Sequence, residues 1–186
     1  MKKLKVGVIR GGISSEREVS LKSGEEIIKE LNKEKYDVKD IILNDKKDIF
    51  TVLEGLEFVF LGLHGKFGED GKVQAILETM DIPYTGCGML SSALCMDKDI
   101  TKHIIKNYDI RTAKWFTVRT GEDYSYEEII EKLKEKIIAK PNSGGSSVGV
   151  HFVNNKNELD EALEDIFKID NEAIIEEDIE GVEISV

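Results

Sequence analysis

Two glycine-rich segments near the start of the chain carry side chains that could bind an ammonium group or a carboxylate. Glu16 follows Gly11 and Gly12, at the end of a short apolar run, and its carboxylate could hold an ammonium group. His64 opens the second segment, which ends at Gly71, and its imidazole can donate to a carboxylate or act as an acid or base. Taken alone, the first segment is also typical of a plain strand-to-helix turn, and the second of a flexible surface loop.

A third segment has the composition of a phosphate-binding loop. Lys140 ends an apolar run and is followed by a Gly/Ser stretch that reaches Gly149. Successive N–H groups in such a loop form an anion-binding nest, to which the lysine adds a charge. The lysine precedes the glycines, so this is not the G-x-x-x-x-G-K-[ST] loop, and the glycine spacing at 11–16 disfavours a nicotinamide-binding fold. A hairpin linker remains the alternative.

Two charged segments are less specific. Lys98 and Lys102 lie in a stretch that reads first of all as a charged helix start. The acidic run 174–183 could present carboxylate and backbone acceptors to an adenine amino group and to ribose hydroxyls. As a bare acidic run it is more often a solvated face.

Composition narrows the class of protein. The 186 residues carry a net charge of -11 with 40% hydrophobic residues, which indicates a folded domain without the basic stripe of a nucleic-acid binder. Because no apolar run approaches the ~20 residues of a membrane span, we expect a cytoplasmic protein that acts neither on nucleic acid nor on a membrane. Cys87 and Cys95 are expected to be small buried residues rather than a disulfide or metal site.

Periodicity predicts the order β-α-β-α-β-α-β over residues 4–85, which is typical of a parallel sheet flanked by helices. Ser15 and Glu18 form a capping-box pattern at the start of the first helix, where Val19 is an expected core residue. The last strand of this series is expected at 82–85. A small α+β domain should follow the helices at 89–96 and 99–107. It has strands expected at 115–118, 137–140, 150–153 and 173–176, and helices expected at 125–136 and 157–167.

The candidate segments occur in the order found in one family. They are Gly11–Ser20, His64–Gly71, Pro83–Gly86, Met96–Lys98 and Lys140–Gly149. In this order they resemble the D-alanine–D-alanine ligases of the ATP-grasp superfamily. The resemblance implies an N-terminal Rossmann-like α/β domain over 1–97, a central α+β ATP-grasp lid over 98–180, and at 181–186 the start of a C-terminal ATP-grasp domain that is missing. We therefore expect the natural protein to continue beyond residue 186.

The resemblance implies an ATP-dependent ligase that makes the D-Ala-D-Ala dipeptide for peptidoglycan synthesis through an acyl phosphate. Glu16 would orient the first D-alanine through its ammonium group, and His64 would lie near its carboxylate. Ser146 would hydrogen-bond Glu16. Lys98 and Lys140 would hold the ATP phosphates under the Ser146–Ser147 backbone. The adenine and ribose contacts implied by the resemblance are Glu176, Glu177, Ile179 and Glu183.

The resemblance also implies Mg²⁺, with its ligands in the missing C-terminal region and no metal ligand in this chain, and it implies a homodimer. Phosphoryl transfer depends on metal ions and cationic groups that neutralise charge, so we expect the 186 residues alone not to catalyse ligation. Two alternatives stay open. One is a variant ligase that makes D-Ala–D-Lac or D-Ala–D-Ser, and the other is a non-catalytic interaction module that binds nucleotide.

Overall fold

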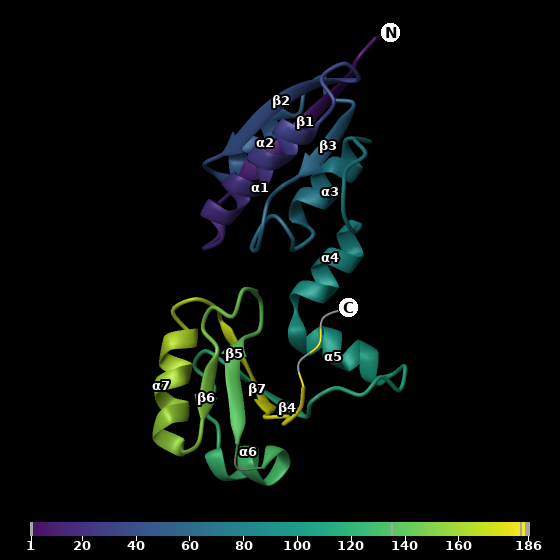
Figure 1. Ribbon diagram of the computed structural model, residues 1–186. Coiled ribbons are helices and arrows are strands. Elements are labelled where there is room, and N and C mark those ends of the chain that lie inside the picture. The colour runs from purple at the N-terminus through teal and green to yellow at the C-terminus, as the bar shows by residue number, and fades with distance from the viewer. Residues whose placement is uncertain (1, 135, 183, 185–186) are drawn as a thin grey trace. The chain divides into compact units, whose positions relative to one another are not determined.

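The computed structural model describes residues 2–134, 136–182 and 184, and these residues form two compact units, which divide between Met96 and Asp97. Each unit has its own sheet and its own core (Figure 1). The first sheet is parallel and the second is antiparallel, so the predicted mixed α/β class is confirmed at this level. Each unit is described separately below.

The first unit is built on a parallel sheet with strand order β2-β1-β3. Its elements are β1 (Leu4–Gly11), α1 (Arg17–Glu30), β2 (Tyr36–Leu43), η1 (Lys46–Asp48), α2 (Ile49–Val52), β3 (Phe58–Leu61), α3 (Lys72–Thr79) and α4 (Met89–Met96). Ile9 of β1 packs in one buried cluster with Ile49 of α2 and Leu77 of α3. Arg10 points to the opposite face and contacts α1 near Gly24. Helices therefore cover both faces of this sheet, as a parallel sheet requires.

Helix α1 begins and packs differently from the prediction. It starts at Arg17 with Glu16 at the N-cap and no side-chain cap, so the predicted Ser15 capping box is wrong. Val19 is 55% exposed and is not a core residue. The buried positions of α1 are Ser20 and Gly24. The Ser20 hydroxyl accepts from the Gly11 N–H at 2.8 Å and donates to the Gly62 carbonyl at 2.6 Å. A small polar residue thus lets the helix lie directly on the strand ends.

The strand expected at 82–85 is reduced to one bridge, between Val59 and Tyr84. Val59 donates to the Pro83 carbonyl at 2.9 Å and accepts from Thr85 at 3.0 Å. Proline has no N–H for the ladder, and the next strand donor, Leu61 N–H, bonds to the Thr85 side chain at 3.0 Å instead of to a backbone carbonyl. The cysteine prediction is also wrong in part, since Cys87 and Cys95 are free as expected but exposed.

The second unit is built on an antiparallel sheet with strand order β4-β7-β5-β6. Its elements are α5 (Lys98–Lys106), β4 (Trp115–Arg119), α6 (Tyr126–Leu133), β5 (Ile137–Pro141), β6 (His151–Val153), α7 (Lys156–Ile166) and β7 (Glu172–Glu177). Ser125 caps α6 by accepting from the Glu128 N–H at 3.2 Å, and the helix ends at Leu133, short of the predicted end at Lys136.

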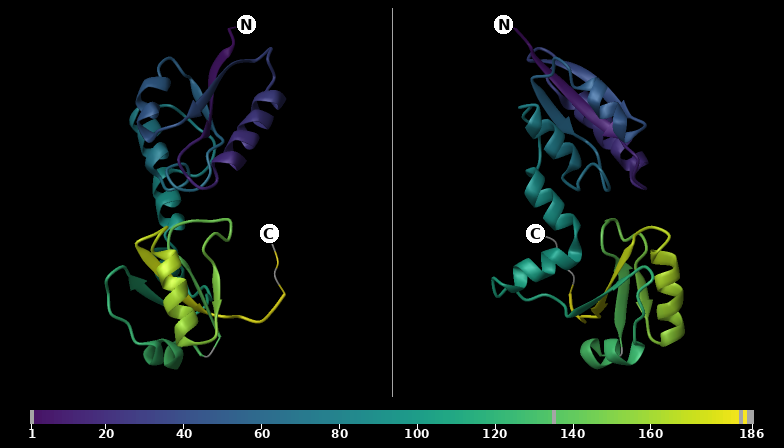
Figure 2. Two further views of the ribbon diagram at one scale, coloured as in Figure 1. Left: turned by 90° about the vertical axis from the view of Figure 1, so that its left-hand side faces the viewer. Right: turned by 180° about the vertical axis from the view of Figure 1, so that it is seen from behind.

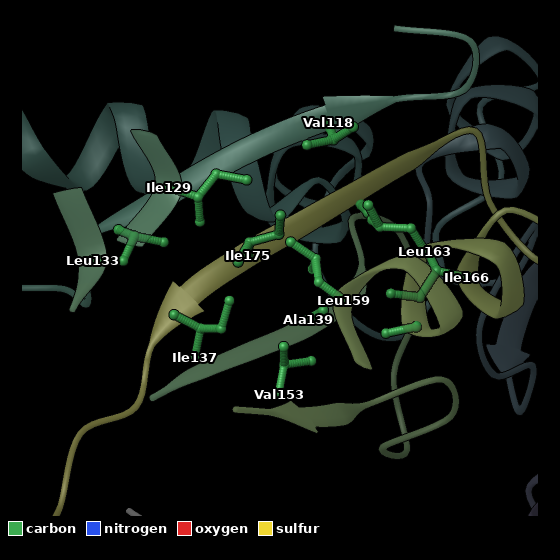
Figure 3. Packing of buried hydrophobic residues seen from close by; sticks show 12 residues of the cluster. Val118, Ile129, Leu133, Ile137, Ala139, Val153, Leu159, Leu163, Ile166 and Ile175 are labelled. Atoms are coloured by element: carbon green, nitrogen blue, oxygen red, sulfur yellow. The ribbon is translucent and has the colours of Figure 1, made fainter. Parts of the chain in front are cut away.

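One face of the second sheet is buried under α6 and α7. Ile129 and Leu133 of α6 and Leu159 of α7 pack on Ile175 of β7 in a single apolar cluster (Figure 3). Figure 2 shows α7 lying along this sheet. Strand residues alternate between faces, so Glu176, next to Ile175, belongs to the opposite face. The apolar face therefore anchors β7 and β5, while Glu176 and Lys140 lie on the other face of the sheet.

The close approach of α1 to β1 predicts an unusual substitution effect. Alanine normally stabilises a helix relative to glycine, but a Cβ on Gly24 would lie 2.4 Å from Arg10 Cδ and 2.5 Å from Arg10 Cβ. We expect Gly24→Ala to lower the free energy of unfolding by about 1–3 kcal/mol because the helix must shift. Thermal unfolding measures this. Gly88→Ala is the control, since its new Cβ would meet nothing closer than 3.5 Å. Equal stability of both variants would contradict the prediction.

Candidate functional site

The first two glycine-rich segments meet at the carboxyl ends of β1 and β3. Ser14 joins them, because its Oγ accepts from the Glu16 N–H at 3.2 Å and donates to the His64 carbonyl at 2.7 Å. Gly65 has φ +68°, and a Cβ there would lie 2.6 Å from Glu16 Oε2. The structure therefore brings Glu16 and His64 to the same edge of the sheet, which is where open α/β sheets bind ligands.

The His64 ring is held by two polar neighbours. Its Nε2 lies 3.0 Å from Ser23 Oγ, and its Nδ1 lies 3.6 Å from Glu69 Oε1. Glu69 also accepts from the Gly65 N–H at 2.7 Å, so this carboxylate fixes both the loop and the ring. The Glu69 side chain was missed as a ring partner, although its place five residues after His64 in a glycine-rich loop is the signal.

Arg17 ties the first segment to β2. Its guanidinium donates to the Gly12 carbonyl at 2.7 Å, the Leu43 carbonyl at 2.6 Å and Asn44 Oδ1 at 2.6 Å. These bonds satisfy carbonyls at the strand ends and hold the turn that precedes Glu16. Arg17 thus supports the loop, and its guanidinium is engaged by protein atoms.

In the second unit, Lys98 and Lys140 line one cavity of about 210 Å³. The remaining lining residues come from the Gly/Ser loop and the strand end beside it, namely Pro141, Gly144, Gly145, Ser146, Ser147, Val148 and Val150. Lys98 Nζ donates to the Gly144 carbonyl at 2.8 Å and to the Asn142 carbonyl at 3.2 Å. The two lysines predicted to hold phosphates are therefore brought together.

The start of α5 fixes Lys98 in this place. Asp97 caps the helix by accepting from the Ile100 N–H at 2.9 Å. Asn142, which follows β5, accepts from Lys98 N–H at 3.2 Å through its carbonyl and from Asp99 N–H at 2.9 Å through its side chain. The helix N-terminus is thereby attached to the strand that carries Lys140.

The Gly/Ser loop holds two serines in a left-handed conformation. Ser146 has φ 52° and Ser147 has φ 58°. Left-handed backbone costs a non-glycine residue roughly 1–2 kcal/mol. Such outliers concentrate at ligand-binding loops. The loop conformation therefore supports a binding role for this segment.

Glu176 lies between two lysines, on the face of the sheet opposite α6 and α7. Its Oε2 is 2.6 Å from Lys140 Nζ, and its Oε1 is 2.9 Å from Lys102 Nζ. Glu176 and Lys102 are only 8% and 7% exposed. Lys102 was considered in the sequence but not assigned to the site. Its spacing of four residues from Lys98, which places both on one face of α5, was the available signal.

The other expected adenine residues lie near a second cavity. It measures about 690 Å³ and is lined by Lys134, Lys136, Glu177, Asp178, Ile179 and Glu180. The Glu177 carboxylate accepts from the Lys114 N–H at 2.9 Å, and the Glu177 N–H donates to the Lys114 carbonyl at 3.1 Å. Ile179 is 65% exposed. Glu183 lies outside the described residues.

The described residues form neither a metal-ligand cluster nor a membrane-spanning helix. Within 2–134, 136–182 and 184, no three His, Cys, Asp or Glu side chains gather as a metal site. In the same part of the chain, no helix is long and apolar enough to cross a membrane.

Two family models match the chain. One, described as D-ala D-ala ligase N-terminus, matches residues 5–55 and 44–87, and the other, D-ala D-ala ligase C-terminus, matches residues 104–186. The chain belongs to the D-alanine–D-alanine ligase family. The candidate segments of both units fall within these matches, except Lys98 and Lys102, which lie between them.

Individual ligases are similar over nearly the whole chain. D-alanine–D-alanine ligase B of Clostridium perfringens (strain 13 / Type A) is 54% identical over 182 residues, which is 98% of this chain and 60% of the relative. The crystal structure of D-alanine–D-alanine ligase from Bacillus anthracis complexed with ATP has a TM-score of 0.87 at 44% identity, over 96% of this chain and 60% of that one. The chain thus spans about 60% of these ligases' length.

A variant ligase is also similar in structure. VanG D-Ala:D-Ser ligase from Enterococcus faecalis has a TM-score of 0.82 at 32% identity, over 97% of this chain and 64% of that chain. The fold is therefore shared between ligases named for different second substrates.

The close contact at Gly65 gives a testable effect. Gly65→Ala places a Cβ at φ +68°, 2.6 Å from Glu16 Oε2 and 3.1 Å from Ser14 Oγ. We expect a loss of about 2–4 kcal/mol in the free energy of unfolding, from backbone strain and from displacement of Glu16. Gly55→Ala is a matched control, with φ +74° and nothing within 4 Å of its Cβ. Urea denaturation measures both, and an equal loss in the two variants would show that the Glu16 contact is unimportant.

The lowered pKa of Lys98 predicts that the stability of the fold depends on pH. Burial, and then the charge of Lys140, lower the pKa of Lys98 below its ordinary 10.5. The folded chain therefore binds this proton less tightly than the unfolded chain, so the stability contribution of Lys98 rises as the pH increases from the lowered pKa to 10.5. Lys98→Met should remove that rise.

Urea denaturation of the unaltered chain and of Lys98→Met over this alkaline range measures the effect. The difference in unfolding free energy between them should move in favour of the unaltered chain as pH increases. Lys168→Met, at a lysine that is 72% exposed, is the control and should show no such trend. A constant difference for Lys98→Met would contradict the prediction.

Proposed function

We propose that this chain provides the amino-acid site and much of the ATP site of a D-alanine–D-alanine ligase. The observation that carries the proposal is the convergence of Lys98 and Lys140 on one cavity with the Gly/Ser loop, in a chain of this family. A chain with a net charge of -11 needs such local cations to attract a triphosphate.

In the amino-acid site, Glu16 holds the ammonium group of the first D-alanine. Its carboxylate approaches the Gly65 backbone, and the Ser14 hydroxyl fixes the turn on which it stands. His64 lies near the substrate carboxylate, with its ring placed between Ser23 and Glu69. These residues bind and orient the amino acid so that its carboxylate is presented for phosphorylation. The hydrogen bond from Ser146 to Glu16 remains part of this proposal.

In the nucleotide site, Lys98 and Lys140 neutralise phosphate oxygens, and the backbone of Ser146 and Ser147 covers them. ATP supplies the phosphoryl group that activates the D-alanine carboxylate. Glu176, Glu177 and Ile179 frame the adenine, and Glu183 binds the ribose. We place the Mg²⁺ ligands in the part of the relatives' length that this chain does not span.

The remaining assignments follow the family. Residues 1–97 serve as the substrate-binding domain, residues 98–180 as the ATP-grasp lid and residues 181–186 as the start of the C-terminal domain. The protein acts in the cytoplasm as a homodimer that makes the D-Ala-D-Ala dipeptide. The relative at 54% identity is named for D-alanine as second substrate, whereas the D-Ala:D-Ser ligase is 32% identical, and this difference favours D-alanine.

Nucleotide binding by the chain tests the proposal. Isothermal titration calorimetry with ATP should detect binding at millimolar nucleotide or below. Lys98→Met and Lys140→Met should each weaken it about tenfold or more, because each removes a charge-assisted contact to phosphate. The surface control Lys168→Met should bind as the unaltered chain does. No heat of binding at millimolar ATP would contradict the proposed nucleotide site.

A further inference from the structure

Lys102 is a buried lysine with a fixed ammonium group. Its Nζ donates to Thr112 Oγ1 at 2.7 Å and to the Ala113 carbonyl at 3.1 Å, and it lies 5.4 Å from the centre of the Trp115 ring. It also lies 2.9 Å from Glu176 Oε1. Burying a charge is costly unless it is paired and hydrogen-bonded, and here every partner is in place. The ammonium is therefore held by the segment that leads into β4 and by Glu176.

The residue lies behind the phosphate cavity. Among the described residues, the side chains that line the 210 Å³ cavity include Lys98 and Lys140 but neither Lys102 nor Glu176. Lys102 touches Glu176, and Glu176 touches Lys140 at 2.6 Å. Lys102 can therefore affect an anion in the cavity only through the Glu176 carboxylate or by a long-range electrostatic interaction.

The charges of Lys140, Glu176 and Lys102 explain why a second lysine is needed beside the Glu176 carboxylate. A buried Glu176 paired with Lys140 alone would cancel the charge that Lys140 offers to a phosphate. With Lys102 present, two ammonium groups and one carboxylate leave one net positive charge. Lys98 adds another, which the nearby Asp170 and Asp97 carboxylates partly offset. Electrostatic interactions are stronger in this partly dry environment than in water. The balance of charge thus decides whether the cavity attracts an anion.

We propose that Lys102 is a positioning residue for the triphosphate: it engages and neutralises Glu176, so that the Lys140 ammonium keeps its charge and its place at the cavity. The inference rests on the proposed function, because it assigns a role within the same nucleotide site. It adds a residue that does not touch the ligand and that acts through a carboxylate.

Calorimetric titration of the chain with ATP and, separately, with inorganic tripolyphosphate tests the inference. Lys102→Met should weaken binding of both probes about tenfold. Lys102→Arg keeps a cation that can bind a carboxylate in two places, and should restore most of the affinity. Lys106→Met is the matched control, since Lys106 is exposed, lies on the same helix and stands 5.9 Å from the same Trp115 ring. It should bind both probes as the unaltered chain does.

A double-mutant cycle shows whether Lys102 acts through Glu176. Tripolyphosphate is the probe here, because it has no adenine for Glu176 to contact. In a Glu176→Gln background, Lys102→Met should weaken binding far less than in the unaltered background, because no carboxylate remains to compete for Lys140. Circular dichroism confirms folding of each variant. Lys102→Gln, which keeps a donor but removes the charge, replaces Lys102→Met if the latter unfolds.

The outcomes separate the inference from the proposed function. Equal weakening in both backgrounds, or unchanged binding by folded Lys102→Met, would overturn the inference while leaving the nucleotide site intact. Binding of tripolyphosphate but not ATP, with the expected dependence on Lys102, would contradict the proposed function and support the inference. Binding of neither probe by the unaltered chain would overturn both.

Discussion

The second unit depends on a buried carboxylate shared by two lysines. Glu176 joins Lys140 on β5 to Lys102 on α5, with distances of 2.6 and 2.9 Å. A buried ion pair alone is weak evidence of stability, because desolvation offsets the attraction. The arrangement instead fixes positions. It holds α5 against the face of the sheet that carries Glu176, and it leaves positive charge beside the Gly/Ser loop. In an acidic chain, that local excess of cations is what an anionic ligand requires.

In the first unit, polar side chains gather at the end of a parallel sheet, and the helix α1 and the loop after β3 pack closely against the strand ends. Gly24 and Ser20 let α1 lie directly on the strands, and Gly65 lets the loop after β3 approach Glu16. Ser14 then connects the two strand ends through its hydroxyl and the His64 carbonyl. Small residues at contact points thus set the geometry of the site as much as the residues that carry its chemistry.

Most elements were predictable from local pattern, and the errors have physical causes. Apolar runs and periodicity predicted the strands that pair in the two described sheets, whereas Pro83 reduces the strand expected at 82–85 to a single bridge. The predicted Ser15 capping box is absent, and the turn is held instead by Ser14 and by the long-range hydrogen bonds of Arg17 to Leu43 and Asn44. Cys87 and Cys95 were expected to be buried because cysteine is among the most buried residue types. Both are exposed in the structure.

The sequence by itself indicated a parallel-sheet unit followed by a small α+β unit, the resemblance to the family, and the candidate segments, because these follow from periodicity and from ordered local motifs. Only the tertiary structure decided which charges meet. Lys102 looked like part of a charged helix start and Glu176 like part of a solvated acidic run. Their pairing joins residues far apart in the chain, and such pairing depends on how α5 docks on β7. Local pattern carries no record of that docking, since it arises from packing between elements rather than within them.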